Sequence, residues 1–170
     1  MSHSGVLKQA DVFFELSPHQ LEQIASVCQE RRFALGDVIF EENSASDELY
    51  VIAQGEVEIL VDPSLVSDRP GGPRHLTTIA TLRRGQSFGE VALVDQGLRS
   101  ATARSASHDT QLIVIPRRML MPLCENDPVL GYRLMRNLAA DLAMKIRNTD
   151  LIIREKLLYA QRTAGPLKGI

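Results

Sequence analysis

The sequence predicts an α+β domain, mainly β, in which short strands form an antiparallel sandwich or barrel with helices at both ends. Three observations support this: a helical apolar period before about residue 30, short apolar runs between turn residues in the middle, and a helical period again after Pro116. The 170 residues, 44% of them hydrophobic, are enough for one domain with its own core. We therefore expect a helical segment at 1–30, strands within 31–116, helices within 117–162 and a tail at 163–170.

The first segment carries a helix start signal. Ser17 followed by Pro18 is typical of an N-cap with proline at the first helical position. One amphipathic face follows at i, i+3, i+4 and i+7, made of Leu21, Ile24, Ala25 and Cys28. Beneath this face we expect three apolar side chains to pack, those of Phe13, Phe14 and Leu16.

From about Arg32 the pattern changes to short apolar runs that predict strands. The runs lie at 38–40, 49–53, 57–61, 77–82, 101–105 and 111–115. Gly55 separates two of them and predicts a hairpin turn, and Pro116 ends the last one. The segment 62–75 holds three prolines and two glycines, so it is predicted to be a loop.

After Pro116 the sequence predicts a short helix over 117–124 and a long one from Asp127-Pro128 to about Ala160. At 1.5 Å per residue the long helix would span roughly 45 Å, more than a small domain needs. Its apolar stripe, interrupted by Thr149, consists of Met135, Leu138, Leu142, Ile146, Ile153 and Leu157. This excess predicts a homodimer through the C-terminal helix; the alternative is that the distal half frays or folds back on its own barrel.

Composition narrows the function classes. The formal net charge of −2 and the pI of about 6.1 argue against a general nucleic-acid binder. Residues 1–111 hold 9 Lys/Arg and 16 Asp/Glu, whereas 112–170 hold 10 and 5. The basic C-terminal part is either a solvated helix face or a contact surface for an acidic partner.

Cysteine, histidine and apolar content point to an ordinary intracellular domain. Cys28 and Cys124 lie in no CxxC motif, and the four histidines lack metal-ligand spacing, so no metal site is predicted. The N-terminus lacks a signal-peptide core, and no apolar run approaches the roughly 20 residues of a membrane span. We therefore expect a soluble, cytoplasmic chain.

The strongest chemical signal is Phe88-Gly89-Glu90-Val91-Ala92-Leu93, followed by Arg99-Ser100-Ala101-Thr102. A guanidinium can bind phosphate oxygens bidentately, and the neighbouring hydroxyl and backbone N–H groups can add further donors. A carboxylate nine residues earlier can accept hydrogen bonds from a sugar hydroxyl. If both groups face one pocket, that pocket fits a phosphorylated sugar.

These two segments resemble the phosphate-binding cassette of the cyclic nucleotide-binding domain, a module of catabolite activator-type regulators, kinase regulatory subunits and cyclic nucleotide-gated channels. Every position of the cassette pattern matches within 88–102, and the resemblance spans about residues 10 to 145. The supporting upstream positions are Gly36, Leu49-Tyr50-Val51-Ile52, Gly55-Glu56-Val57, Gly85 and Phe88. The resemblance implies an eight-stranded β-roll (a double-stranded β-helix or jelly roll) flanked by an N-terminal helix and a long C-terminal helix.

The chain departs from the family pattern at two places. Asn43 stands where a glycine is frequent, but asparagine tolerates left-handed backbone angles. Gly97-Leu98 precedes Arg99 where proline is common, which would loosen that loop slightly.

The resemblance assigns roles within the cassette. Glu90 would accept a hydrogen bond from the ribose 2′-hydroxyl, Arg99 would pair with the cyclic phosphate, and Ser100 would donate its hydroxyl to it. A short helix starting near Gly89 would aim N–H groups at the anion. The implied ligand-binding set is Gly89, Glu90, Val91, Ala92, Arg99, Ser100 and Ala101. Within it, Gly89 and Ala92 let the backbone approach the ligand, whereas Val91 is expected to anchor the helix, with Phe88 packed inside.

The nucleotide base needs a lid, which in the family commonly comes from the helix after the roll. The candidate residues are Arg133, Arg136, Asn137 and Asp141. Each is otherwise an ordinary solvated helix residue, and a lid could also reach over from the neighbouring subunit.

The predicted function is a cyclic nucleotide-binding regulatory domain that acts as a ligand-operated switch on an effector protein not identifiable from the sequence. cAMP is favoured over cGMP, although the Ser100 hydroxyl suits both; either is a ligand, and no cofactor is implied. Catalysis is not predicted, because no nucleophile–base pair, metal set or P-loop is present.

Three alternatives remain open. One is the ligand-binding part of a DNA-binding regulator, although only about 20 residues follow Asp150, too few for a helix-turn-helix module unless the chain is a fragment. The others are a scaffold that has lost its ligand, and a site for a different ligand such as a cyclic dinucleotide. Direct nucleic-acid binding by this chain is not expected.

Overall fold

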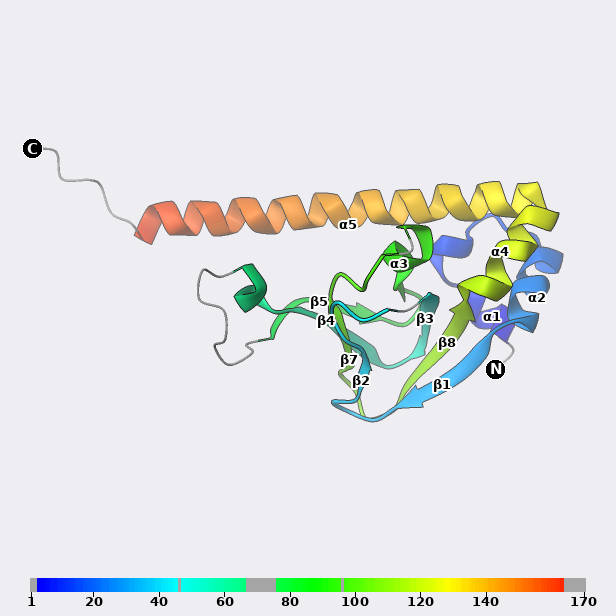
Figure 1. Ribbon diagram of the computed structural model, residues 1–170, viewed down its shortest axis with the longest axis horizontal. Coiled ribbons are helices and arrows are strands. Elements are labelled where there is room, and N and C mark those ends of the chain that lie inside the picture. Colours follow the sequence, from blue (N-terminus) through cyan, green and yellow to red (C-terminus); the bar gives the residue numbers. More distant parts are fainter. Residues whose placement is uncertain (1–2, 46, 67–75, 96, 164–170) are drawn as a thin grey trace, which may run out of the picture.

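The computed structural model describes residues 3–45, 47–66, 76–95 and 97–163, and it contains two four-stranded antiparallel sheets (Figure 1). The first sheet has the order β1 (Gln29–Phe33), β8 (Thr110–Pro116), β3 (Glu48–Gln54) and β6 (Ser87–Phe88). The second has the order β2 (Val38–Phe40), β7 (Thr102–Ser105), β4 (Glu56–Val61) and β5 (Thr77–Arg83). The predicted mainly β fold is confirmed. Most of the predicted loop, 67–75, and the end of the tail, 164–170, lie outside the described residues.

Helices flank the sheets at both ends of the chain. Those before the sheets are α1 (His3–Leu7), the 3-10 turn η1 (Asp11–Phe13) and α2 (Pro18–Ser26). Another 3-10 turn, η2 (Pro63–Val66), follows β4, and α3 (Glu90–Asp95) follows β6. After the sheets come α4 (Arg117–Asn126) and α5 (Pro128–Thr163). In Figure 1, α5 runs along one side of the molecule and passes over α3. Its 36 residues give a length of about 54 Å.

The N-terminal helix begins where the sequence predicts. The Ser17 hydroxyl accepts from the Gln20 backbone N–H and the Gln20 side chain accepts from Ser17, so the two residues form a capping box. Phe13 and Leu16 are buried as expected, but Phe14 is 63% exposed, which corrects that prediction. Phe14 follows the 3-10 turn with an extended backbone (ψ 140°), so it does not continue the turn whose Val12 and Phe13 are buried. A second correction is that β1 begins at Gln29, inside the segment predicted to be helical.

The central strands bury both of their faces. In β3, Leu49 and Val51 pack into the core beneath the helices, whereas Tyr50 and Ile52 pack between the two sheets. β8 divides in the same way, with Ile113 and Ile115 on the helix side and Leu112 and Val114 on the inner side. Because successive strand residues point to opposite faces, such strands read as continuous apolar runs.

Gly55 does not form the hairpin that the sequence predicts. β3 and β4 on either side of it belong to different sheets, so Gly55 is a corner at which the chain crosses from one sheet to the other. Its φ of +86° favours glycine, and a Cβ there would lie 2.8 Å from the Thr110 hydroxyl. Thr110 also donates to the Glu56 carbonyl, so the corner is tied to the start of β8.

Candidate functional site

The predicted cassette is a strand–turn–helix unit whose turn requires glycine. β6 ends at Phe88, Gly89 has a φ of +83°, and α3 begins at Glu90. A Cβ on Gly89 would lie 2.6 Å from Nη1 of Arg99 and 2.9 Å from the Glu48 carbonyl oxygen. Glycine therefore serves both the backbone angle and the close approach of the arginine.

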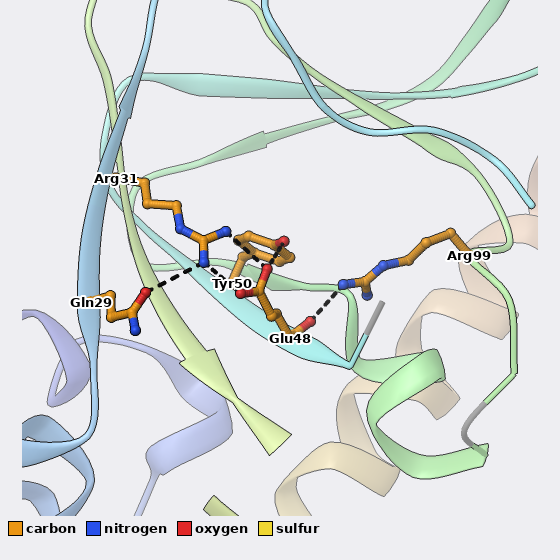
Figure 2. Close-up of polar contacts among 5 residues, drawn as sticks. All are labelled: Gln29, Arg31, Glu48, Tyr50 and Arg99. Carbon is orange, nitrogen blue, oxygen red and sulfur yellow. Dashed lines mark hydrogen bonds and ion pairs between the residues drawn. The ribbon is translucent and has the colours of Figure 1, made fainter. Parts of the chain in front are cut away.

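Arg99 is almost completely buried, with 2% of its surface exposed. Its Nη1 donates to the Gly89 carbonyl at 2.9 Å. Its Nη2 donates to the Glu48 carbonyl at 2.9 Å (Figure 2). Burial lowers the pKa of Arg99, and the nearby Tyr50 and Glu48 side chains offset this lowering only partly. The guanidinium nevertheless remains charged, as it does in proteins generally. The cassette thus holds a buried positive charge that is hydrogen-bonded to the Gly89 carbonyl.

An aromatic floor lies under this guanidinium. The carbon Cζ of Arg99 is 4.2 Å from the centroid of the Phe40 ring and 5.5 Å from that of Tyr50. Tyr50 stacks on Phe88 with the ring centroids 5.0 Å apart, and Phe40 lies tilted against both rings. The rings lock the plane of the guanidinium through cation–π contacts and exclude water from one of its faces.

A polar network positions Glu48. Its carboxylate accepts from Nη1 of Arg31 at 2.9 Å and from the Tyr50 hydroxyl at 2.6 Å (Figure 2). Burial would raise the pKa of Glu48, but the bonds from Arg31 and Tyr50 outweigh it, so the pKa is lowered. The same residue that anchors this network offers its carbonyl oxygen to Arg99, so β1 and β3 together fix the arginine.

Glu90 is buried at the first position of α3, with 4% of its surface exposed. Its Oε1 lies 2.9 Å from Nζ of Lys145, which comes from α5. Lys145 also donates to the Ser87 carbonyl at 3.1 Å and lies 2.7 Å from Oδ2 of Asp141. Burial lowers the pKa of Lys145, but Glu90 and Asp141 outweigh this effect and raise it, so the ammonium stays charged.

The remaining cassette residues surround these two charged groups. Ser100 is exposed beside Arg99, Ala101 is 9% exposed, Val91 is half-buried and Phe88 is buried. The side chain of Ala92 lies outside the described residues. Asn43 has a φ of +64°, so the predicted left-handed turn is present, and its N–H donates to the Arg99 carbonyl.

Three of the four predicted lid residues are engaged elsewhere. Arg133 donates to the Glu15 carbonyl at 2.8 Å, and Arg136 pairs with the Glu15 carboxylate at 2.7 Å. Asn137 donates to the carbonyls of Val12 and Phe14. Asn137 lies eight residues before Lys145, about 12 Å along the helix axis, so these three residues fasten α5 to the N-terminal segment instead of reaching the cassette. Asp141 alone reaches the site, through Lys145.

Sequence reasoning missed the partners of both charged groups. Lys145 had a signal, because Asp141 and Lys145 stand at i and i+4 on a predicted helix and can pair there. Glu48 had none, because it binds Arg99 through its backbone carbonyl, which every residue carries. Phe40 and Tyr50 were read only as strand residues.

The described residues offer no metal centre, since they contain no group of three or more His, Cys, Asp or Glu that could hold an ion. Both cysteines are free, and burial raises the pKa of Cys28 to about 12 and also raises that of Cys124. Their thiols are therefore protonated and poor nucleophiles near neutral pH. Among the helices that the structure describes, none has the length and apolar character needed to cross a bilayer.

Known proteins share both the sequence pattern and the fold. The pattern of the family described as "Cyclic nucleotide-binding domain" matches residues 30–127. The cyclic AMP receptor protein of Thermus thermophilus is 33% identical over 145 residues, which cover 85% of this chain and 61% of that protein. The cGMP-dependent protein kinase, isozyme 1, of Drosophila melanogaster is 29% identical over 123 residues, which cover 70% of this chain and 15% of the kinase.

The chain thus spans less than two thirds of the length of either relative. Among solved structures, a cyclic nucleotide-binding domain from Methylobacillus flagellatus KT superimposes with a TM-score of 0.74 at 24% identity. The superposition covers 91% of this chain and 82% of that one, and it shows a shared fold. The matched residues include the whole strand–turn–helix unit that carries Glu90 and Arg99, and the chain belongs to the cyclic nucleotide-binding domain family.

Proposed function

We propose that this chain binds a cyclic mononucleotide at the cassette and acts as a ligand-operated switch on a partner protein. The observation that carries the proposal is that a buried guanidinium, Arg99, is hydrogen-bonded to the residue directly before a buried carboxylate, Glu90. Arg99 donates to the carbonyl of Gly89, the residue directly before Glu90. The guanidinium can donate hydrogen bonds to an anion, and the carboxylate can accept one from a hydroxyl. These are the contacts that the cyclic phosphate and the ribose of one nucleotide require.

Each cassette residue has a role in this proposal. Phosphate oxygens would accept hydrogen bonds from Arg99, because hydrogen bonds between two charged groups are stronger than those to neutral groups. The exposed Ser100 hydroxyl would donate to the same phosphate, and Glu90 would accept from the ribose 2′-hydroxyl. The lack of a side chain at Gly89 and the small ones at Ala92 and Ala101 would let the ligand approach the backbone. These are binding roles, so we propose a regulatory binding module without catalytic activity.

cAMP is the first candidate ligand, and cGMP is the second. The relative with 33% identity is named for cyclic AMP, and the one with 29% identity is a cGMP-dependent kinase. A serine hydroxyl next to the arginine can serve either nucleotide. No cofactor is part of the proposal.

We also propose that the chain forms a homodimer through the distal part of α5. Met135, Ile146, Ile153 and Leu157 are between 37% and 62% exposed and lie on one stripe of the helix. Leu138, which was predicted to belong to that stripe, is 1% exposed in the domain's own core. α5 is one continuous helix to Thr163, so the distal stripe does not fold back on its own domain. A second copy would bury it as in a coiled coil.

The dimer can be tested by sedimentation velocity at micromolar concentration. The double variant Ile146→Glu, Ile153→Glu should sediment as a monomer, whereas the wild type should sediment as a dimer. Leu151→Glu is the matched control, because residues two apart do not share a helix face and Leu151 is also exposed. A monomeric wild type would refute the dimer.

We propose that the chain acts in the cytoplasm, and its effector is expected there. Support comes from the two free cysteines, which fit a reducing compartment. We propose that the effector is a protein, since the chain's net charge of −2 does not favour nucleic acid.

Isothermal titration of the wild-type chain with cAMP, cGMP and a cyclic dinucleotide tests the ligand. Saturable binding of cAMP well below millimolar concentration is the expected result. Saturation only by the cyclic dinucleotide would change the ligand class. No saturation by any of the three at millimolar concentration would refute binding and leave a scaffold with the family fold.

A further inference from the structure

The carboxylate that would read the ribose already has a partner within the chain. The Glu90 side chain is 6% exposed, and its Oε1 accepts from the Lys145 ammonium at 2.9 Å. An ammonium has three N–H donors. Here Lys145 donates to Glu90 and to the Ser87 carbonyl, and it forms an ion pair with Asp141. Oε1 of Glu90 is therefore already in use when a hydroxyl approaches the carboxylate.

This contact joins two separate elements of the fold. Glu90 and Ser87 belong to the cassette, whereas Lys145 and Asp141 belong to α5. Among the residues of α5 whose burial the structure describes, Lys145 is the last that is not exposed, since residues 146–159 are all exposed. Earlier turns of α5 are held by Leu130, Leu134 and Leu138 in the core. The distal half of α5 thus leaves the domain directly after the contact with Glu90.

We propose that Lys145 is a latch, a residue of α5 that competes with the ribose 2′-hydroxyl for Glu90, so that ligand entry releases α5 from the cassette. The latch rests on the proposed function, because it assigns a competitor to the ribose contact of the same site. It adds a route by which ligand binding at the cassette changes the packing of α5. In this proposal the sugar and Lys145 compete for the same buried carboxylate, and the ligand can shift α5 only through the difference in its affinity for the latched and released states.

The latch has a measurable cost in affinity. If most molecules hold Glu90 on Lys145, only the remaining fraction can receive the ribose, and the apparent dissociation constant rises by the inverse of that fraction. A hydrogen bond to a charged group is worth enough to make this factor roughly tenfold or more. A nucleotide without the 2′-hydroxyl gains nothing from Glu90, so it does not compete with Lys145.

A two-by-two titration isolates this competition. cAMP and 2′-deoxy-cAMP are titrated into the wild type and into Lys145→Met, and the ratio of the two dissociation constants is compared. The latch predicts that Lys145→Met binds cAMP about tenfold more tightly and that the ratio in favour of cAMP rises by about the same factor. Lys156→Met, at an exposed lysine of the same helix, is the control and should leave both constants unchanged.

A second readout reports on α5. Arg147 is exposed two residues beyond the latch, so tryptic cleavage after Arg147 should accelerate when cAMP saturates the wild type. In Lys145→Met the cleavage should be fast already and should respond little to cAMP. If the methionine variant does not fold, Lys145→Gln keeps an N–H donor for Glu90 and tests the same ratio without the positive charge.

The outcomes separate the latch from the binding proposal. If the wild type binds cAMP but Lys145→Met shows the same ratio of dissociation constants, the site stands and the latch is wrong. An equal gain in affinity for both nucleotides would also overturn it, because Lys145 would then obstruct the site without competing at Glu90. If neither the wild type nor the variant binds either nucleotide, the proposed function fails and the latch fails with it.

Discussion

The two ends of the site are held by different parts of the molecule. Arg99 is bound by backbone carbonyls of the strand and turn region and rests on the rings of Phe40 and Tyr50. Glu90 is bound by the side chain of Lys145 from α5. The phosphate end of the site, at Arg99, is therefore part of the rigid roll. The sugar end, at Glu90, is also in contact with a helix whose distal half is exposed. The difference suggests that one end of the site supplies affinity and the other carries the signal.

The largest expected effect follows from the loss of the phosphate end. Arg99→Ala should weaken cAMP binding by about a hundredfold or more, because a bidentate charge-assisted contact is removed. Titration calorimetry measures this loss. Arg104→Ala, which removes an arginine that pairs with Glu58 on the neighbouring strand, is the control and should bind normally. Wild-type affinity in Arg99→Ala would mean that the rigid end is not the phosphate site.

Gly89→Ala should affect both ends of the site at once. The residue has a φ of +83°, and a Cβ would lie 2.6 Å from Nη1 of Arg99. The substitution should reduce the free energy of unfolding by about 2 kcal/mol and weaken nucleotide binding. Urea unfolding measures the first effect. Gly5→Ala, where a Cβ would meet nothing within 4 Å, should change neither property, and a stable Gly89→Ala variant with normal binding would contradict the proposed turn.

Glu48 should make the rigid end sensitive to acid. Its pKa in the folded chain lies below the ordinary value, so the Arg31–Glu48–Tyr50 network contributes fully above the ordinary value of about 4.3 and is lost as the pH falls through the folded value. After solvent screening the contribution is about 0.5–1 kcal/mol.

Urea unfolding between pH 7 and pH 3 checks this dependence. The wild type should lose this increment of stability on acidification, whereas Glu48→Gln should already lack it at pH 7. Glu155→Gln, at an exposed acid on α5, is the control and should follow the wild-type curve. A Glu48→Gln variant as stable as the wild type at pH 7 would show that the network does not support Arg99.

The smallest expected effect concerns the stability of the sugar end. Lys145→Gln should lower the free energy of unfolding by about 1 kcal/mol or less, because glutamine keeps an N–H donor for the buried Glu90, the lysine side chain is 35% exposed, and the exchange does not open the core. Leu138→Ala, one helical turn before Asp141, should cost about 2–5 kcal/mol because Leu138 is 1% exposed. Thermal or urea unfolding compares the two. A Lys145→Gln variant as unstable as Leu138→Ala would make the lysine a structural element instead of a movable one.

Local signals in the sequence were sufficient for most elements and for the cassette. The Ser17-Pro18 start, the apolar runs at 49–53 and 111–115 and the glycine before Glu90 each act within a few residues of the chain. β1 carries no such signal, since Gln29–Phe33 is largely charged and becomes a strand by pairing with β8. The hairpin at Gly55 was predicted wrongly for a related reason: turn residues do not reveal which sheet the next strand joins.

In the candidate site, too, some residues could be predicted from local sequence and others could not. Glu90 and Arg99, residue types that suit a phosphorylated sugar, could be predicted from their spacing, and the resemblance of the cassette to a known family implied a nucleotide. Their partners lie 51 and 55 residues away in the sequence, at the Glu48 carbonyl and the Lys145 ammonium. The sequence does not show that Asn137 and its neighbours donate hydrogen bonds to carbonyls of residues 12–15. These bonds form only because the N-terminal segment packs on α5.

Hydrogen–deuterium exchange with and without saturating cAMP tests the contrast between the two ends most directly. We expect cAMP to change the exchange of α5 amides around residues 139–150, while the amides of β3, whose Glu48 carbonyl holds Arg99, keep their protection. Unchanged α5 exchange under conditions in which calorimetry shows saturation, or equal changes in α5 and β3, would contradict a rigid phosphate end coupled to a movable sugar end.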